Sequence, residues 1–229
     1  MNALKHSVFA LFFGLTVGVA QAGALDAISS GDASAGVKEA LAKGADYAVS
    51  SLGKSGGFMG NDKVKIKLPG YLEKADSALR MFGMGKQADQ LVETMNRAAE
   101  NAVAEAKPIL TESIKKMSVK DAKDILTGGE DSVTQYFKRT STDQLTAKFK
   151  PVVKKETAKL QLADQYNKFA GKAASAGLVD KQNADVDSYV TQKAMDGLFL
   201  MIAEEEKKLR ANPMGAGSDL LKNVFGALN

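Results

Sequence analysis

Residues 194–203 read AMDGLFLMIA, and Asp196 is the single charged residue among them. A helix that is apolar on nearly all of its faces is normally buried on nearly all of them. The run is too short to cross a bilayer, which takes about 20 apolar residues. We therefore expect a helix over residues 187–211 at the centre of the fold, with residues 198–202 in the core.

Asp196 becomes a candidate binding residue because of its place inside this run. A buried carboxylate needs an ion pair or hydrogen bonds, since burial alone raises its pKa. Lys193, one turn earlier, is one available partner, and an arginine from another helix is a better one. Two interpretations stay open: a structural ion pair or core-rim residue, and a functional carboxylate.

Helical patterns extend from this run over most of the chain. Apolar residues recur at helical spacing over residues 37–52 and 91–117, and Pro108 is expected to kink or divide the second helix. Ser118 to Asp121 and Ser141 to Gln144 have the spacing of capping boxes, each of which opens a helix. The sequence predicts one all-α domain over residues 23–229, with about eight helices around the helix at 187–211.

One short segment differs from the helical pattern. Val64, Ile66 and Leu68 alternate with lysines over residues 63–68, as in a strand, without an obvious partner strand. It is expected either to lie extended on helices or to form a short edge pairing. The glycine-rich stretch before it, Gly53–Gly60, is interpreted as a mobile connector.

The first 22 residues have the three parts of a secretory signal. Lys5 and His6 precede an apolar run, Val8–Val19, and Ala20-Gln21-Ala22 provides a small-x-small cleavage site. We expect cleavage after Ala22 and a periplasmic mature protein. The chain has no cysteine and no tryptophan, and its one histidine is His6. The mature chain would therefore lack all three residue types.

This composition excludes several kinds of chemistry from the mature chain. Ser-His-Asp and Cys-His nucleophiles cannot be assembled, and neither can zinc sites that use histidine or cysteine. The net charge of +4 is too mild to indicate nucleic-acid binding. Gly85-Lys86 lacks the upstream glycine and the following Ser or Thr of a phosphate loop, so no nucleotide is expected either. No metal, cofactor or transmembrane span is predicted.

Polar clusters on the predicted helices supply the candidate binding residues. Arginine is rare, which indicates that each one has a specific partner, and Tyr136 and Arg139 form an aromatic-basic cluster at a helix end. Residues 204–206 read EEE and fit a solvated face, with Glu204–Lys208 and Glu206–Arg210 pairs one turn apart. The candidates for ligand binding are Arg97, Glu100, Tyr136, Arg139, Asp196 and Glu204.

A basic face on the helix that follows Gln144 gives a further partner hypothesis. Lys148, Lys154, Lys155 and Lys159 lie opposite Phe149, Val152 and Val153. Such a face fits weak contact with an anionic lipid surface, although a merely solvated face has the same pattern.

Three stretches resemble a known bacterial family. They are MNRAAENAVAEAKPI at 95–109, TQYFKRTSTDQL at 134–145 and YVTQKAMDGLFLMIAEEEKKLRANP at 189–213. They are similar to an exported family of unknown function, DUF4197, over about residues 24–226. The resemblance implies an envelope protein of mostly Gram-negative bacteria. It implies no activity, cofactor or catalytic residue.

The leading functional hypothesis is a non-catalytic binding or interaction protein of the cell envelope. The alternative is a carboxylate-dependent hydrolase or lyase that acts on an envelope polymer. It requires two carboxylates, or one carboxylate with a Tyr or Lys, in one cleft. A third hypothesis is an assembly partner that docks through Gly53–Gly60 and Val64–Leu68.

Overall fold

The computed structural model describes residues 30–69, 72–73, 76–158, 160–175, 185–212 and 218–226. Within these ranges the regular secondary structure is helical throughout, which confirms the all-α prediction. The helices are α2 (Ser30–Leu52), α4 (Asp76–Met81), α5 (Gly85–Ala104), α6 (Lys107–Lys116), α7 (Val119–Thr127), α8 (Ser132–Thr157), α9 (Gln161–Ser175), α10 (Val186–Ala211) and α11 (Asp219–Gly226).

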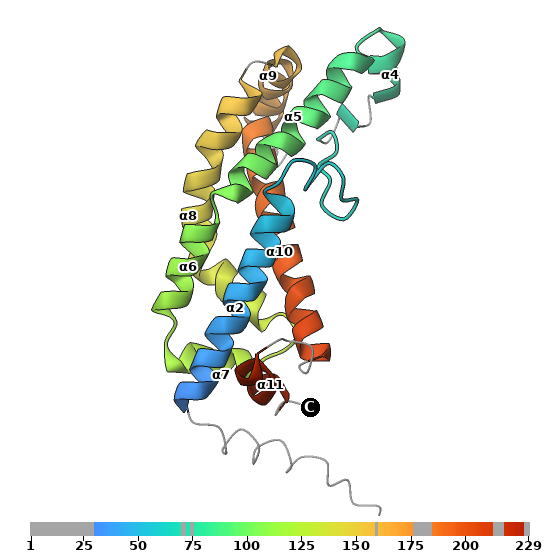
Figure 1. The fold of residues 1–229 in the computed structure, drawn as a ribbon. Coiled ribbons are helices and arrows are strands. Elements are labelled where there is room, and N and C mark those ends of the chain that lie inside the picture. Colours follow the sequence, from blue (N-terminus) through green and yellow to red (C-terminus); the bar gives the residue numbers. More distant parts are fainter. Residues whose placement is uncertain are drawn as a thin grey trace, which may run out of the picture.

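The long helices run side by side along an elongated molecule (Figure 1). Helix α10 packs against α8, α2 and α5, and so occupies the centre as expected. Helices α4 and α9 lie at one end of the molecule, whereas α7 and α11 lie at the other (Figure 1). None of the helices in the described ranges is long and apolar enough to cross a membrane.

Helix α10 buries three of its faces and exposes a fourth. Leu198 and Ile202 are fully buried, and Phe199 and Met201 nearly so. Asp196, in contrast, has a half-exposed side chain, and Leu200 is 39 % exposed one turn further on. Asp196 is not buried and Leu200 is not in the core, contrary to the prediction, because both lie on the stripe of α10 that no neighbouring helix covers. Asp196 pairs with Lys193 at 3.8 Å, which fits the first of its two interpretations, a structural ion pair or core-rim residue.

Residues 65–68 of the strand-like segment lie on helices without a partner strand in the described residues, as the first of its two interpretations predicted, whereas residues 62–64 form a turn. Val64, Ile66 and Leu68 are all buried. The fully buried Asn96 of α5 takes the place of a partner strand. Its Oδ1 accepts a hydrogen bond from the Ile66 amide at 2.9 Å, and its Nδ2 donates to the Ile66 carbonyl at 2.8 Å. One side-chain amide thereby satisfies both main-chain groups of a buried residue.

The glycine-rich loop is anchored rather than mobile. Its Phe58 is fully buried, and the Phe58 and Met59 amides donate to Glu100 Oε1 at 3.0 and 3.3 Å. The Phe58 ring lies against Gly197 of α10, where an added Cβ would come within 2.8 Å of Cε1. The composition of the loop indicated mobility, whereas one aromatic side chain and one carboxylate attach it to the core.

The two prolines of the helical region have opposite effects. Pro108 stands in the first turn of α6 and separates it from α5, as predicted. Pro151 lies on the exposed side of α8, which continues through it.

The predicted capping box at Ser141 is wrong, because Ser141 is a buried interior residue of α8. Around it the hydroxyls of Thr140 and Thr142 donate to carbonyls four residues earlier, instead of capping a helix.

Two sequence predictions fall outside the described residues. They are the secretory signal in residues 1–22 and the lysine at position 159 of the basic face.

Candidate functional site

A furrow lies between α6, α7 and α8. It has two parts, with cavity volumes of about 300 and 240 Å³, and Asp121, Tyr136 and Arg139 line both of them. The larger part is also lined by Ile109, Glu112, Ser113, Lys116, Thr140 and Gln144. The smaller part continues toward the start of α8 and is also lined by Asp124, Ile125, Asp131, Ser132 and Gln135. We call these two parts together the α6–α8 furrow.

The capping box at the start of α7 fixes Asp121 in the furrow. The Asp121 amide donates to Ser118 Oγ at 3.1 Å, and the Ser118 amide donates to Asp121 Oδ2 at 3.0 Å. This confirms the capping box that the sequence predicted. The hydrogen bond from the Ser118 hydroxyl, with smaller contributions from the Ser118 amide and Arg139, lowers the pKa of Asp121. Asp121 is therefore a fixed negative charge at neutral pH.

Arg139 lies at the junction of the two parts. Its Nη2 donates to Asp121 Oδ1 at 2.9 Å, and its guanidinium carbon lies 5.5 Å from the centre of the Tyr136 ring. We call this arrangement the Arg139 clasp. The Arg139 side chain is nevertheless 64 % exposed. A guanidinium has five N–H donors, so the hydrogen bond to Asp121 leaves others available to a ligand.

Tyr136 forms the floor beneath the clasp. Its ring is buried, and its hydroxyl donates to the Ser113 carbonyl at 2.8 Å. Burial raises the pKa of Tyr136, so the phenol remains protonated and bonded to the main chain. Ser113 and Thr140 share a hydroxyl hydrogen bond of 2.5 Å beside it. The floor is thus held by bonds within the protein.

The family model described as "Protein of unknown function (DUF4197)" matches residues 27–226. The chain belongs to this family. The match covers both the furrow and the central helix, and it confirms the family that the sequence resembles. No curated protein and no solved structure matches the chain.

In this DUF4197 chain, the furrow brings together two of the six predicted binding residues, Tyr136 and Arg139. The other four lie elsewhere. Arg97 is exposed on α5, and Asp196 is exposed on α10, with Gln192 as its hydrogen-bond donor at 2.9 Å. Glu100 is buried beneath the glycine-rich loop, and Glu204 pairs with Lys63 at 2.5 Å. Glu100 and Glu204 therefore hold residues 58–63 in place. The predicted Glu204–Lys208 pair is replaced by Glu205–Lys208 at 3.2 Å.

None of the furrow residues that α6 and α7 supply was among the predicted binding residues. Glu112, Lys116 and Asp121 come from helices that reach the furrow only through tertiary packing. The capping box was the available signal for Asp121, but it indicates a helix start and not a site. Among the described residues, no group of three or more acidic or other ligating side chains is arranged to hold a metal ion.

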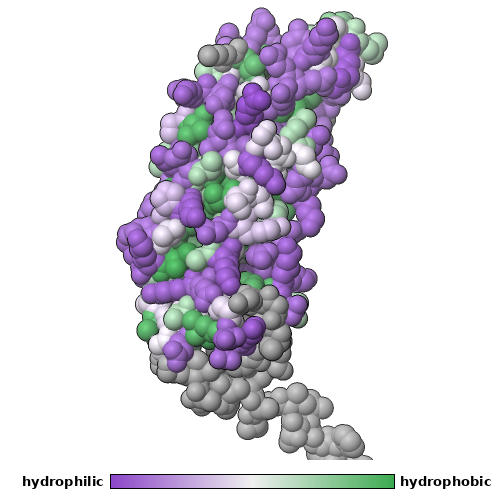
Figure 2. All heavy atoms as spheres, viewed as in Figure 1, coloured by the Kyte–Doolittle hydropathy of each residue, from purple (hydrophilic) through white to green (hydrophobic). Residues whose placement is uncertain are grey.

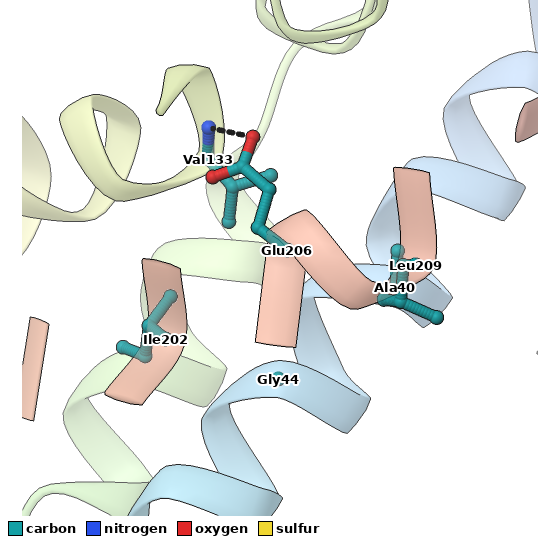
Figure 3. Close-up of a pocket in the computed structure, with 6 residues that line it drawn as sticks. All are labelled: Ala40, Gly44, Val133, Ile202, Glu206 and Leu209. Carbon is teal, nitrogen blue, oxygen red and sulfur yellow. Dashed lines mark hydrogen bonds between the residues drawn. The ribbon is translucent and has the colours of Figure 1, made fainter. Parts of the chain in front are cut away.

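Glu206 in this family member is a second finding that the sequence missed. The prediction of a solvated face is wrong for Glu206, whose side chain is 2 % exposed at the first turn of α8. It accepts hydrogen bonds from the Val133 and Thr134 amides at 3.1 and 3.3 Å, and from Arg210 Nη2 at 3.0 Å. Figure 3 shows the carboxylate directed at Val133 beside a cavity of about 10 Å³. The predicted Glu206–Arg210 pair is present, in the interior.

Proposed function

We propose that the protein is a non-catalytic binding protein of the bacterial cell envelope. Its ligand lies in the α6–α8 furrow and carries a carboxylate or phosphate group. The observation that carries this proposal is the Arg139 clasp, which holds a guanidinium over an aromatic ring at the junction of the two parts of the furrow. A planar guanidinium with free donors matches a two-oxygen anion.

The dimensions and lining of the furrow support a small ligand or a segment of a polymer. Its larger part, about 300 Å³, is at the lower end of the range for small-molecule sites. Ile109 contributes an apolar wall, while Thr140 and Gln144 contribute neutral polar groups. Lys116 adds a second cation near the same space, at 3.4 Å from Glu112. Because four carboxylates also line the furrow (Glu112, Asp121, Asp124 and Asp131), the ligand places its one anionic group at Arg139 and its hydroxyls or amides along the rest of the lining.

The ionisation of the furrow supports binding over catalysis. A hydrolase or lyase needs a carboxylic acid that is protonated near neutral pH, or a free base. Asp121 has a lowered pKa and is engaged by Ser118 and Arg139. The Tyr136 hydroxyl is committed to a main-chain carbonyl. Glu112, half-exposed beside Lys116, is the carboxylate on which the enzymatic alternative depends.

The envelope location rests on residues 1–22, whose charged, apolar and small-residue parts have the order of a secretory signal. Fractionation of cells and mass analysis of the recovered chain test it. A chain that starts at Gly23 in the periplasmic fraction is the expected result, and an unprocessed cytoplasmic chain would contradict the proposed location.

Thermal-shift measurements with wild type and Arg139→Gln test the furrow. The panel consists of glycerol phosphates, acidic peptides and peptidoglycan fragments. We expect the melting temperature of the wild type to rise with at least one anionic class, and Arg139→Gln to lose that rise. Arg97→Gln is the matched control, since it removes an exposed arginine that does not line the furrow. An equal loss in both variants would show a general charge effect.

Glu112→Gln separates the binding function from the enzymatic alternative. If the furrow only binds, this variant retains ligand binding and no product forms from any panel compound with either protein. Turnover by the wild type that Glu112→Gln abolishes would replace the binding proposal with the hydrolase or lyase.

A further inference from the structure

Two large apolar side chains are almost fully exposed where α4 turns into α5. Met81 is 86 % exposed and Phe82 is 82 % exposed. They lie at the end of the elongated molecule that carries α4 (Figure 1), where Figure 2 shows a small pale-green group at the edge of a mostly hydrophilic surface. We call Met81 and Phe82 the α4 tip. Scattered single apolar residues are ordinary on a protein surface. Two adjacent apolar side chains with this much exposure indicate an interaction surface.

The protein holds the α4 tip in place with ion pairs behind it. Arg80 Nε donates to Asp76 at 2.9 Å, and Arg80 Nη1 and Nη2 donate to Asp89 of α5 at 3.3 and 2.7 Å. The chain reverses direction between α4 and α5 at Gly83, whose φ is +75°. A residue with a side chain would be strained at this φ. Arg80 thereby ties α4 to α5 on either side of the reversal, and the apolar pair is presented outward.

Met81 and Phe82 by themselves are too few for a stable protein interface. Such interfaces bury roughly 800 Å² on each partner and involve about 20–30 residues a side. A bilayer interface makes no such demand, since it accepts a protruding apolar wedge with cations beside it. The exposed Lys86 in the first turn of α5 supplies a cation next to the tip. Arg80, in contrast, faces two carboxylates, Asp76 and Asp89, whose summed charge exceeds its own by one.

We propose that the α4 tip inserts into the interface of a phospholipid bilayer, with Met81 and Phe82 among the acyl chains and Lys86 at the phosphate level. Contact is weak and reversible, because two side chains bury little apolar surface. The elongated molecule then stands on the membrane by its α4 end and holds the α6–α8 furrow away from it. This inference does not depend on the furrow's having a ligand.

Tryptophan fluorescence tests the tip directly, because the chain contains no tryptophan. Phe82→Trp places a reporter in the tip. Val119→Trp is the matched control, at a 55 % exposed apolar residue of α7 at the other end of the molecule. Both full-length variants are mixed with vesicles of phosphatidylethanolamine and phosphatidylglycerol. A local readout is needed because the apolar run Val8–Val19 can itself attach a full chain to vesicles.

We expect the emission of Phe82→Trp to shift to the blue with vesicles and to be quenched by brominated lipid, while Val119→Trp does neither. Adding Lys86→Glu to Phe82→Trp should weaken the apparent vesicle affinity severalfold. No response in Phe82→Trp, or equal responses in both single variants, would overturn the proposal. A blue shift that grows with protein concentration without vesicles would assign the tip to self-association and would equally overturn it.

Discussion

The Glu206 carboxylate lies at the first turn of α8, where it accepts main-chain hydrogen bonds and pairs with Arg210. A negative charge there complements the partial positive charge of the helix N-terminus. Arg210 in turn donates to the Ile125 carbonyl at 2.9 Å and to Ser132 Oγ at 2.7 Å. The pair therefore joins the end of α7, the start of α8 and the last turns of α10.

Removing Glu206 should be costly for this reason. Glu206→Ala removes the carboxylate that pairs with Arg210 and accepts from the Val133 and Thr134 amides, and we expect it to lower the free energy of unfolding by about 3 kcal/mol. Glu205→Ala is the control, since it breaks a pair with the exposed Lys208 and should cost less than about 1 kcal/mol. Urea denaturation followed by circular dichroism measures both. Equal costs would contradict the assigned role of Glu206.

Glu206 also gives a stability term that depends on pH. Burial raises its pKa above the ordinary value of 4.5, although the Val133 amide and Arg210 offset part of the effect. The folded state then binds the proton more tightly than the unfolded state, so stability falls as pH rises from 4.5 through the raised pKa. We expect the free energy of unfolding of the wild type, relative to Glu206→Gln, to fall over that window and then level off. A relative stability that rises over it would contradict this assignment.

At the scale of the helix, two buried glycines on neighbouring elements should respond in opposite ways. Gly44 lies inside α2, where an added Cβ meets nothing within 4 Å and borders the cavity beside Glu206. Gly44→Ala should stabilise the protein by about 0.5–1 kcal/mol through helix propensity. Gly197→Ala forces the Phe58 ring to move and should destabilise it by roughly 1–3 kcal/mol. Thermal melts of the two variants check the signs, and equal signs would refute the packing described.

The helices were predictable to different degrees for physical reasons. Periodicity and caps act locally, so α5, α6, α7 and the central α10 could be read from the chain. The continuation of α8 past Ser141 and Pro151 could not, because the hydroxyls around Ser141 bond within the helix instead of capping a new one. The exposed stripe of α10 could not be predicted from the sequence either, because the face that stays uncovered depends on where the neighbouring helices end.

At the scale of the whole molecule, α10 contacts α2, α5 and α8 along the length of the structure. The two ends should therefore unfold together. We expect amide exchange at Ile66, near the loop, and at Val133, at the start of α8, to have the same opening free energy as global unfolding in urea. If the opening free energy at one of the two sites were well below the free energy of global unfolding, the described helices would form two independent units.

Part of the candidate site could be predicted from the sequence. Tyr136 and Arg139 are close in sequence, so their clustering was visible in the chain. Asp121, Glu112 and Lys116 reach the furrow through the packing of α6 and α7 on α8, which no local pattern encodes. The same limit explains why Glu100 and Glu204 were chosen as binding residues, although they hold the chain's own loop.

The close approach of the Phe58 ring to Gly197 also has an evolutionary consequence. Because a Cβ at position 197 would lie 2.8 Å from that ring, the two positions cannot enlarge independently. Across the family they should covary: sequences with alanine or serine at the position of Gly197 should have a side chain smaller than phenylalanine at the position of Phe58. The side-chain size allowed at position 58 of the loop therefore depends, during evolution, on the residue at position 197 of the central helix.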